Sequence, residues 1–309
     1  MPDSSLILRQ VILRAATDAR VRRFVDRYGM RLGGERFVAG TTLDDAVGVL
    51  RRLDEQGLLT NTTLLGEHVT EDQAAREVAA IYERVLERIS AEALRTNVAL
   101  KLTHLGLEFG EEIAYANVAR VVEKAAELGN FIRIDMEESQ WVDATLRIYR
   151  RLREAGYDNV GTVLQAYLYR TEPDLESLLD LKPNLRLVKG AYLEPAELAY
   201  PEKADVDASF VRLIERSLRD GGFTAAATHD EKIIEHSIAF TEREPIPRER
   251  FQFQMLYGVR PQLQLDLVAR GFAVLVATPY GPDWYRYFMR RLAERPANTL
   301  FFIKNLVRG

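Results

Sequence analysis

The chain has 309 residues, 47% of them apolar, with a formal net charge of −4 and no cysteine. The missing thiols exclude disulfides, zinc–thiolate sites, iron–sulfur clusters and thiol nucleophiles. The mildly acidic balance gives no indication of nucleic-acid binding. No signal peptide is evident, and no apolar run approaches the roughly 20 residues of a membrane helix. We expect a cytoplasmic protein and leave open a peripheral contact with the inner face of the cell membrane.

Two helices are predicted at the start of the chain. Residues 5–29 carry apolar side chains at helical spacing, and Gly29 closes the stretch. Thr42 is the expected N-cap of a second helix, Leu43 to Gln56, which Gly57 ends. We interpret residues 1–60 as a helical arm. Its apolar stripe needs a partner, which is either the rest of the chain or a second subunit in a homo-oligomer.

Short apolar runs then alternate with longer amphipathic segments. The expected strands are Thr62–Gly66, Val98–Leu102, Phe131–Asp135, Val160–Ala166, Leu185–Lys189, Phe223–Thr228, Phe251–Leu256 and Phe272–Ala277. The expected helices cover 71–94, 111–129, 139–156, 172–181, 205–221, 231–243, 259–270 and 283–294. Eight strand–helix units over residues 61–309 predict an α/β fold, a TIM-like (β/α)₈ barrel. A doubly wound open sheet is the alternative, but no GxGxxG or Walker motif occurs.

Polar side chains gather where the predicted strands end, which is where barrels bind ligands. In chain order they are Glu67, His68, Lys101, His104, Asp135, Glu137, Glu138, Gln165, Tyr167, Arg186, Lys189, Thr228, His229, Asp230, Tyr257 and Tyr280. Charged side chains also stand inside apolar runs, where burial without a partner is costly. These are Lys101, Arg133, Arg186 and Lys189, and each is read either as functional or as part of an ion pair that fills the barrel.

The final predicted helix carries two adjacent arginines, Arg290 and Arg291, just after a buried strand. Tyr287 and Glu294 lie three or four positions away from them, so all four can share a helix face. Two guanidiniums need an anion. That anion is either a protein carboxylate or the carboxylate of a substrate.

The same strand-end residues are compatible with other chemistries. His229 and His236 lack HExxH-like spacing, so no metal site is expected. Asp135, Glu137 and Glu138 could form a glycosidase acid/base cluster, although helix capping and solvation is the preferred reading of the two glutamates. Lys101 or Lys189 could form a Schiff base, as in barrel aldolases. A non-catalytic barrel that binds an anionic metabolite is a third class.

Six segments at the strand ends together resemble one family. They read Lys101-Leu-Thr-His-Leu-Gly, Arg133-Ile-Asp-Met-Glu, Val163-Leu-Gln-Ala-Tyr, Arg186-Leu-Val-Lys-Gly-Ala-Tyr, Ala227-Thr-His-Asp and Tyr287-x-x-Arg-Arg-x-x-Glu. In this order they are similar to proline dehydrogenase, most of all to the short monofunctional bacterial enzymes. The resemblance implies a distorted (βα)₈ barrel that holds FAD and oxidises L-proline to Δ1-pyrroline-5-carboxylate. It further implies that the electrons pass to a membrane quinone.

The resemblance assigns the substrate side of the site. It implies that Arg290 and Arg291 grip the substrate carboxylate and that Lys101 lies beside it. Tyr287 is implied to pack on the substrate ring, Leu256 to form the apolar wall, and Asp135 to be an acid near Lys101. Glu67 resembles the acid that pairs with the first arginine and helps to close the site.

The resemblance also assigns the flavin side. It implies that Arg186 lies near the reactive nitrogen and that Gln165 contacts the isoalloxazine edge. Lys189, Gly190 and Ala191 are implied to lie along the flavin, and Thr228 and His229 toward its ribityl or phosphate part. Because the chain has no dinucleotide fingerprint, FMN stays open beside FAD.

One position departs from the family. A tyrosine usually stands shortly before the proline of Pro-Tyr-Gly, and in the matching stretch here, Val274-Leu-Val-Ala277-Thr-Pro279, Ala277 takes its place. We expect Ala277 to widen the pocket toward ring-substituted prolines such as 4-hydroxyproline. The alternative is that Tyr280 or Tyr285 fills the space.

Overall fold

The computed structural model describes residues 34–66, 68–69 and 71–294, together with Asp18, Arg23, Val25 and residues 29–30. Of residues 290–294 it describes the backbone alone. The helix predicted over residues 5–29 therefore lies outside the described residues, apart from isolated positions. In the part of the chain that is described, no helix combines the length and the apolar composition needed to cross a membrane.

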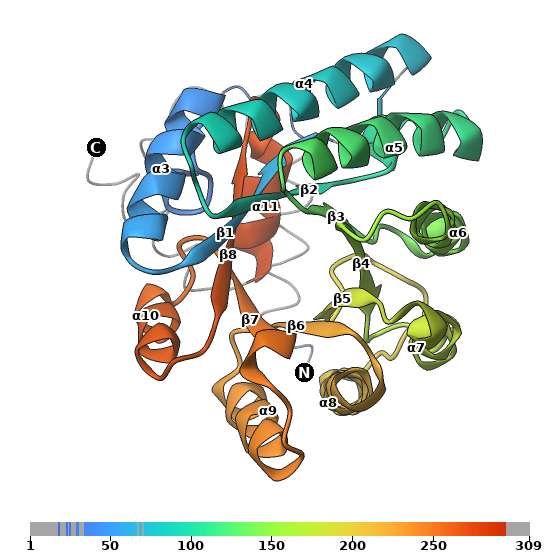
Figure 1. Ribbon diagram of the computed structural model, residues 1–309, viewed down its shortest axis with the longest axis vertical. Helices are drawn as coiled ribbons and strands as arrows, with labels where there is room; N and C mark the ends of the chain where they lie inside the picture. Colours follow the sequence, from blue (N-terminus) through green and yellow to red (C-terminus); the bar gives the residue numbers. More distant parts are fainter. Residues whose placement is uncertain are drawn as a thin grey trace.

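Eight parallel strands form a closed barrel in sequence order, with β8 paired to β1, which confirms the predicted barrel (Figure 1). The strands are β1 (Leu59–Leu64), β2 (Thr96–Leu100), β3 (Ile132–Ile134), β4 (Val160–Gln165), β5 (Asn184–Val188), β6 (Phe223–Ala227), β7 (Phe251–Leu256) and β8 (Val274–Tyr280). The helices are α3 (Leu43–Glu55), α4 (Asp72–Ala91), α5 (Glu111–Glu127), α6 (Val142–Glu154), α7 (Thr171–Leu178), α8 (Lys203–Asp220), α9 (Glu231–Arg243), α10 (Pro261–Ala269) and α11 (Trp284–Glu294). Short 3₁₀ turns are η1 (Gly34–Arg36), η2 (Thr103–Leu105), η3 (Ser139–Trp141), η4 (Leu179–Leu181) and η5 (Arg248–Arg250).

The strands alternate between two environments. The registers place Val98, Ile132, Leu185 and their outward neighbours against the helices, in one large apolar core. The opposite set points into the barrel and is rich in amides and charges. It includes Asn61, Asn97, Arg133, Asn184, Arg186, Gln252 and Gln254. The period-2 alternation of a strand thus separates the apolar core from a polar lumen.

Helix α3 occupies a place in the outer ring. Thr42 caps it as predicted, in a capping box in which the hydroxyl accepts from the Asp45 backbone N–H. The helix packs against β1 and β8 and lies between α4 and α10 (Figure 1). In the described residues, this early helix therefore covers the last strand.

Helix α11 is not part of the outer ring of helices, because it packs elsewhere. Trp284, Tyr285, Phe288 and Met289 form a second apolar cluster, and Leu65 and Leu256 pack against it. The other members of this cluster are Val25, Phe37, Val38 and Val259. Leu65 directly follows β1 and Leu256 ends β7. The helix therefore lies over the carboxyl mouth of the barrel, inside the ring of helices in Figure 1.

Seven of the eight strands differ from their predicted ranges at one end or both, and the differences are largest at β1 and β8. Strand β1 begins at Leu59, so the predicted start of the barrel at residue 61 falls inside it. The polar composition of β1 hid its first residues, Leu59 to Asn61, from a search for apolar runs. Strand β8 continues through Pro279 to Tyr280, three residues beyond the predicted end at Ala277. Proline is tolerated there because β7 ends opposite Ala277, leaving β1 as the strand paired with this stretch.

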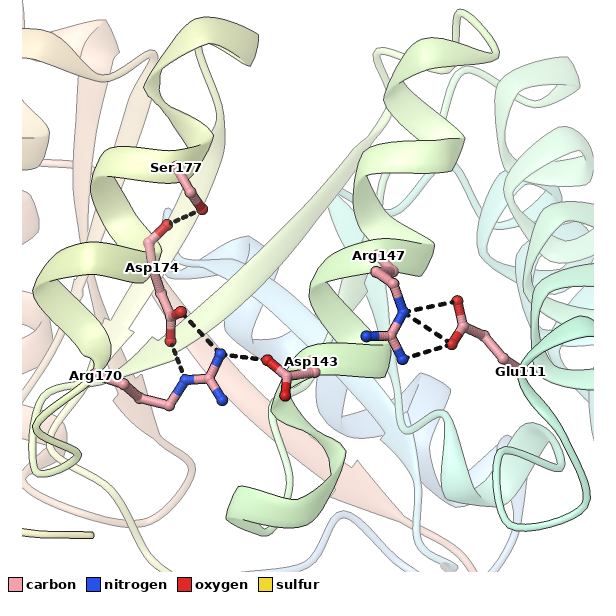
Figure 2. Close-up of polar contacts among 6 residues, drawn as sticks. All are labelled: Glu111, Asp143, Arg147, Arg170, Asp174 and Ser177. Carbon is pink, nitrogen blue, oxygen red and sulfur yellow. Dashed lines mark hydrogen bonds and ion pairs between the residues drawn. The ribbon is translucent and has the colours of Figure 1, made fainter.

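Ion pairs connect neighbouring helices of the outer ring. They include Arg120–Glu83, Arg147–Glu111, Arg151–Glu112, Arg170–Asp143, Arg212–Glu172, Arg216–Glu176 and His236–Glu215. Figure 2 shows two of them. Arg170 forms two bonds to Asp174, of 2.8 and 3.0 Å, and reaches Asp143 of α6 at 2.5 Å. These bonds raise the pKa of Arg170. Arg147 binds Glu111 of α5, and its side chain is more exposed than that of Arg170.

Arg170→Met should destabilise the protein more than Arg147→Met. The Asp174 side chain is only 12% exposed, so removal of Arg170 leaves a largely buried carboxylate without its cation. We expect a loss of about 1–3 kcal/mol for Arg170→Met and below about 1 kcal/mol for Arg147→Met. Thermal unfolding of both variants with the parent tests the ranking, and an equal or reversed order would contradict it.

Candidate active site

The strand registers place six of the predicted site residues on the lumen side of the barrel. Gln165, Arg186, Leu256 and Ala277 lie on the inward face of their strands, and Lys101 and Asp135 directly continue the inward set of β2 and β3. All six stand at or near the carboxyl ends of their strands. One wall of polar groups at one mouth of the barrel is the usual geometry of a barrel active site.

Arg186 connects three alternate strands across the lumen. It forms an ion pair with Asp135 beyond β3, and its Nη1 lies 3.4 Å from the Gln254 Oε1 of β7. Only 11% of the Arg186 side chain is exposed, and burial lowers its pKa to about 9, which leaves it cationic at neutral pH. Its Nε is buried and has no hydrogen-bond partner among the described residues. The site therefore retains one cationic donor for which an acceptor is missing.

Arg133 lies one layer deeper, where the barrel itself supplies its hydrogen-bond acceptors. Its Nη1 donates to the carbonyls of Thr162 and Asn184 at 3.0 and 2.7 Å, and its Nη2 bonds to the Asn184 side chain. Gly161 makes room for it, since a Cβ there would lie 2.4 Å from the guanidinium. These bonds give Arg133 a structural role, although its partners are two carbonyls and an amide and not the carboxylate of the expected ion pair.

Glu137 is a part of the site that the sequence analysis misread. It was expected to be solvated, yet it is 1% exposed. Its carboxylate accepts from the Thr103 N–H at 3.0 Å and from the Thr103 hydroxyl at 2.5 Å. Its carbonyl accepts from the Gln165 amide at 2.9 Å. The one sequence signal was its position two residues beyond the inward-facing Asp135.

Lys189 is engaged in ion pairs at the end of β5. Its ammonium contacts Asp207 of α8, and Asp230 Oδ2 lies 3.7 Å away. An ion-paired ammonium is a poor nucleophile, which weakens the Schiff-base reading of this lysine. Gly190 follows with φ +117°, and a Cβ on it would run into the Tyr167 ring. Ala191 is exposed.

His229 joins the flavin side of the predicted site to its substrate side. Its Nε2 accepts the backbone N–H of Leu256 at 2.9 Å, so this nitrogen carries no proton. Its neighbour Thr228 is buried, and the Thr228 hydroxyl accepts from the Asp230 N–H at 3.1 Å. His236, the other candidate metal ligand, instead contacts Glu215 on α8. Among the described residues, no three potential ligands come together as a metal site.

The roof of the site is formed by α11. Tyr287 is half-buried and packs against the apolar cluster that holds this helix over the mouth. Arg290 and Arg291 lie three and four residues further along the same helix, at positions that share a face with Tyr287. The side chains of both arginines lie outside the described residues, as does Glu67, so their predicted contacts stay predictions.

The residues around Ala277 decide one of the alternatives stated for it. Ala277 faces the lumen and is registered with Asn61 and Leu256. Tyr280 lies three residues later on the outward face, where it is buried in the core near Tyr82. Burial raises the pKa of Tyr280 to about 12. The idea that Tyr280 fills the space beside Ala277 is therefore wrong.

Comparison with known proteins agrees with this geometry. Residues 46–304 match the model of the family described as proline dehydrogenase. The chain is 41% identical over 302 residues to proline dehydrogenase 1 of Bacillus subtilis, covering 98% of this chain and all of that protein. It is 42% identical over 307 residues to proline dehydrogenase of Deinococcus radiodurans, covering 98% and 99% of the two chains.

Solved structures show the same fold at lower identity. Proline utilization A from Bdellovibrio bacteriovorus, in a structure inactivated by N-propargylglycine, superposes with a TM-score of 0.83 at 23% identity. The match covers 94% of this chain and 37% of that one. From the family model and the relatives of full length, we conclude that this chain belongs to the proline dehydrogenase family.

Proposed function

We propose that this protein is a flavin-dependent proline dehydrogenase that oxidises L-proline to Δ1-pyrroline-5-carboxylate, the first step of proline breakdown to glutamate. The observation that carries the proposal is the gathering of Lys101, Asp135, Gln165, Arg186 and Leu256 at one mouth of the barrel. These residues stand in a chain that is 41% identical along its length to a proline dehydrogenase.

The residues that are present fit a flavin, and we propose FAD. Arg186 keeps a buried Nε donor without a partner, as expected of a group that meets a cofactor nitrogen or oxygen. Gln165 ends the neighbouring strand β4, in register with Val188 two residues beyond Arg186, and Thr228 and His229 follow the end of β6. When bound, the flavin would supply the acceptor for the hydride. Arg186, a buried cation, would stabilise negative charge that develops on it.

The remaining residues bind and orient the substrate. In the proposal, Arg290, Arg291 and Lys101 hold the carboxylate, while Tyr287 and Leu256 enclose the ring. This leaves the ring carbon next to the nitrogen as the atom directed toward the cofactor. The surrounding cations disfavour a protonated ring nitrogen, and the neutral amine is the form from which hydride can leave. Residue Glu67 would pair with the first arginine and help to close the site.

We further propose that the electrons pass to a membrane quinone. Transfer to such an acceptor requires the protein to meet a membrane surface, which supports a peripheral contact of an otherwise cytoplasmic protein. We also propose that the part of the N-terminal arm that precedes α3 contacts a second subunit.

An anaerobic absorption spectrum tests cofactor, substrate and reaction together. The purified protein should show flavin bands in the visible range, and these bands should bleach when L-proline is added. The absence of flavin, even after incubation with FAD or FMN, would overturn the proposal. Release of the bound cofactor by heat and its chromatographic identification separates FAD from FMN.

Arg290→Met and Arg291→Met should each lower kcat/KM for L-proline. Loss of one partner of a desolvated carboxylate clamp costs about 2–5 kcal/mol of transition-state stabilisation, because it leaves the substrate charge incompletely paired. Steady-state kinetics of both variants measure this loss. Arg286→Met, which removes an exposed arginine from the same helix, is the matched control. A near-normal kcat/KM in either test variant would refute the clamp.

Ala277→Tyr should restrict the substrate range. The added ring would enter the lumen beside Leu256 and exclude substituents on the proline ring. We expect the ratio of kcat/KM for L-proline over 4-hydroxy-L-proline to rise by about tenfold or more, as for a filled apolar pocket. The same ratio in parent and variant would show that Ala277 does not set the pocket.

A further inference from the structure

Glu137 holds the turn that follows β2. Its carboxylate accepts both hydrogen bonds that Thr103 can donate through its backbone and its hydroxyl, at 3.0 and 2.5 Å. Thr103 begins η2 and lies two residues after Lys101. Because the carboxylate is almost completely buried, these bonds form in a low dielectric and are strong. The segment that follows β3 therefore fixes the position of the chain just beyond Lys101.

The main chain of Glu137 orients a second site residue. Its carbonyl accepts from the Gln165 Nε2 at 2.9 Å, and Gln165 is only 3% exposed. An amide whose nitrogen faces a carbonyl presents its own oxygen in the other direction. Gln165 is thereby held as a hydrogen-bond acceptor for whatever lies beside it in the lumen.

The charge of Lys101 acts on the same carboxylate. Burial raises the pKa of Glu137, and the cation of Lys101 is the largest influence that opposes this rise. A cation near a buried carboxylate stabilises its ionised form. Lys101 and the carboxylate that holds the Thr103 turn are therefore electrostatically coupled.

We propose that Glu137 is a positioning residue of this active site, which sets Lys101 through the Thr103 turn and presents the Gln165 oxygen to the cofactor. It acts through these neighbours and does not itself contact the substrate. The inference rests on the proposed function, since it assigns Lys101 to the substrate carboxylate.

Two effects of Glu137→Gln oppose each other, so the sign of the result is informative. Removal of a negative charge near the site would by itself attract a substrate carboxylate more strongly. Glutamine keeps one acceptor oxygen and replaces the other with an NH₂ donor, so one of the two Thr103 donors would lose its acceptor and the turn that sets Lys101 would loosen. If positioning dominates, binding must weaken.

The test measures the binding of cyclopentanecarboxylate to the holoenzyme through the change in flavin absorbance. This compound has the ring and carboxylate of proline but no nitrogen to be oxidised. We expect its Kd and the KM for L-proline to rise about tenfold in Glu137→Gln, with a smaller change in kcat. Thr103→Val, which keeps the charge but loses the hydroxyl, should raise Kd by a smaller factor, and Thr103→Ser should restore it.

Asp45→Asn is the matched control. Asp45 accepts from the Thr42 N–H at 3.1 Å and from the Thr42 hydroxyl at 2.7 Å, the same pair of donors, in the cap of α3. It should lower the thermal midpoint while Kd stays at the parent value. An unchanged or tighter Kd in Glu137→Gln would overturn the inference. If that variant does not fold, an unchanged Kd in Thr103→Val would do so. A parent protein that neither binds cyclopentanecarboxylate nor is reduced by proline would instead refute the proposed function.

Discussion

The closed register of eight parallel strands is the constraint on which the rest of this structure depends. Once β8 pairs with β1, the inward or outward direction of each strand residue is fixed around the whole barrel. A slip of one residue would exchange the polar lumen with the apolar outer core. Arg186 could then no longer meet Asp135 and Gln254 across the lumen. The chemistry of the site and the stability of the core are thus set by the same registration.

The helices at the two ends of the barrel sequence, α3 and α11, are placed differently from what is expected of a (β/α)₈ barrel. The helix that follows the last strand would ordinarily cover that strand from outside. Here α3, which precedes the first strand, packs on β1 and β8, and α11 packs over the carboxyl mouth. The apolar faces explain this division: α3 carries Ala46, Val49 and Leu53 toward the main core, whereas α11 has its own partners in the second cluster. Because α11 is not needed in the outer ring, it can carry the positions that are proposed to bind substrate.

Much of the fold followed from local patterns, and the misses have physical causes. Apolar runs predicted the bounds of β7 to the residue. The first part of β1 instead bonds to β2 through hydroxyl and amide pairs such as Thr60–Thr96 and Asn61–Asn97, and polar residues of this kind give no apolar run. The strand-end rule found Lys101, Asp135 and Arg186. It could not distinguish Arg133, because only the three-dimensional packing shows its carbonyl partners.

The burial of Glu137 and the outward direction of Tyr280 were equally out of reach. Both depend on where a strand ends, and a boundary error of two or three residues reverses or hides the direction of a side chain. Periodicity locates the middle of an element better than its ends, and active sites of barrels are built at the ends. The resemblance to a family assigned roles to the strand-end residues, but it predicted neither the burial of Glu137 nor the direction of Tyr280.

The packing of α3 has a consequence for the order in which the molecule can form during translation. This helix is synthesised early, yet one of the two strands that it packs against is β8, one of the last segments to be synthesised. Until then its apolar face and the outer side of β1 have an incomplete partner. A domain in which a helix before the first strand packs on the last strand cannot complete its outer layer stepwise, so final closure is a late, long-range step.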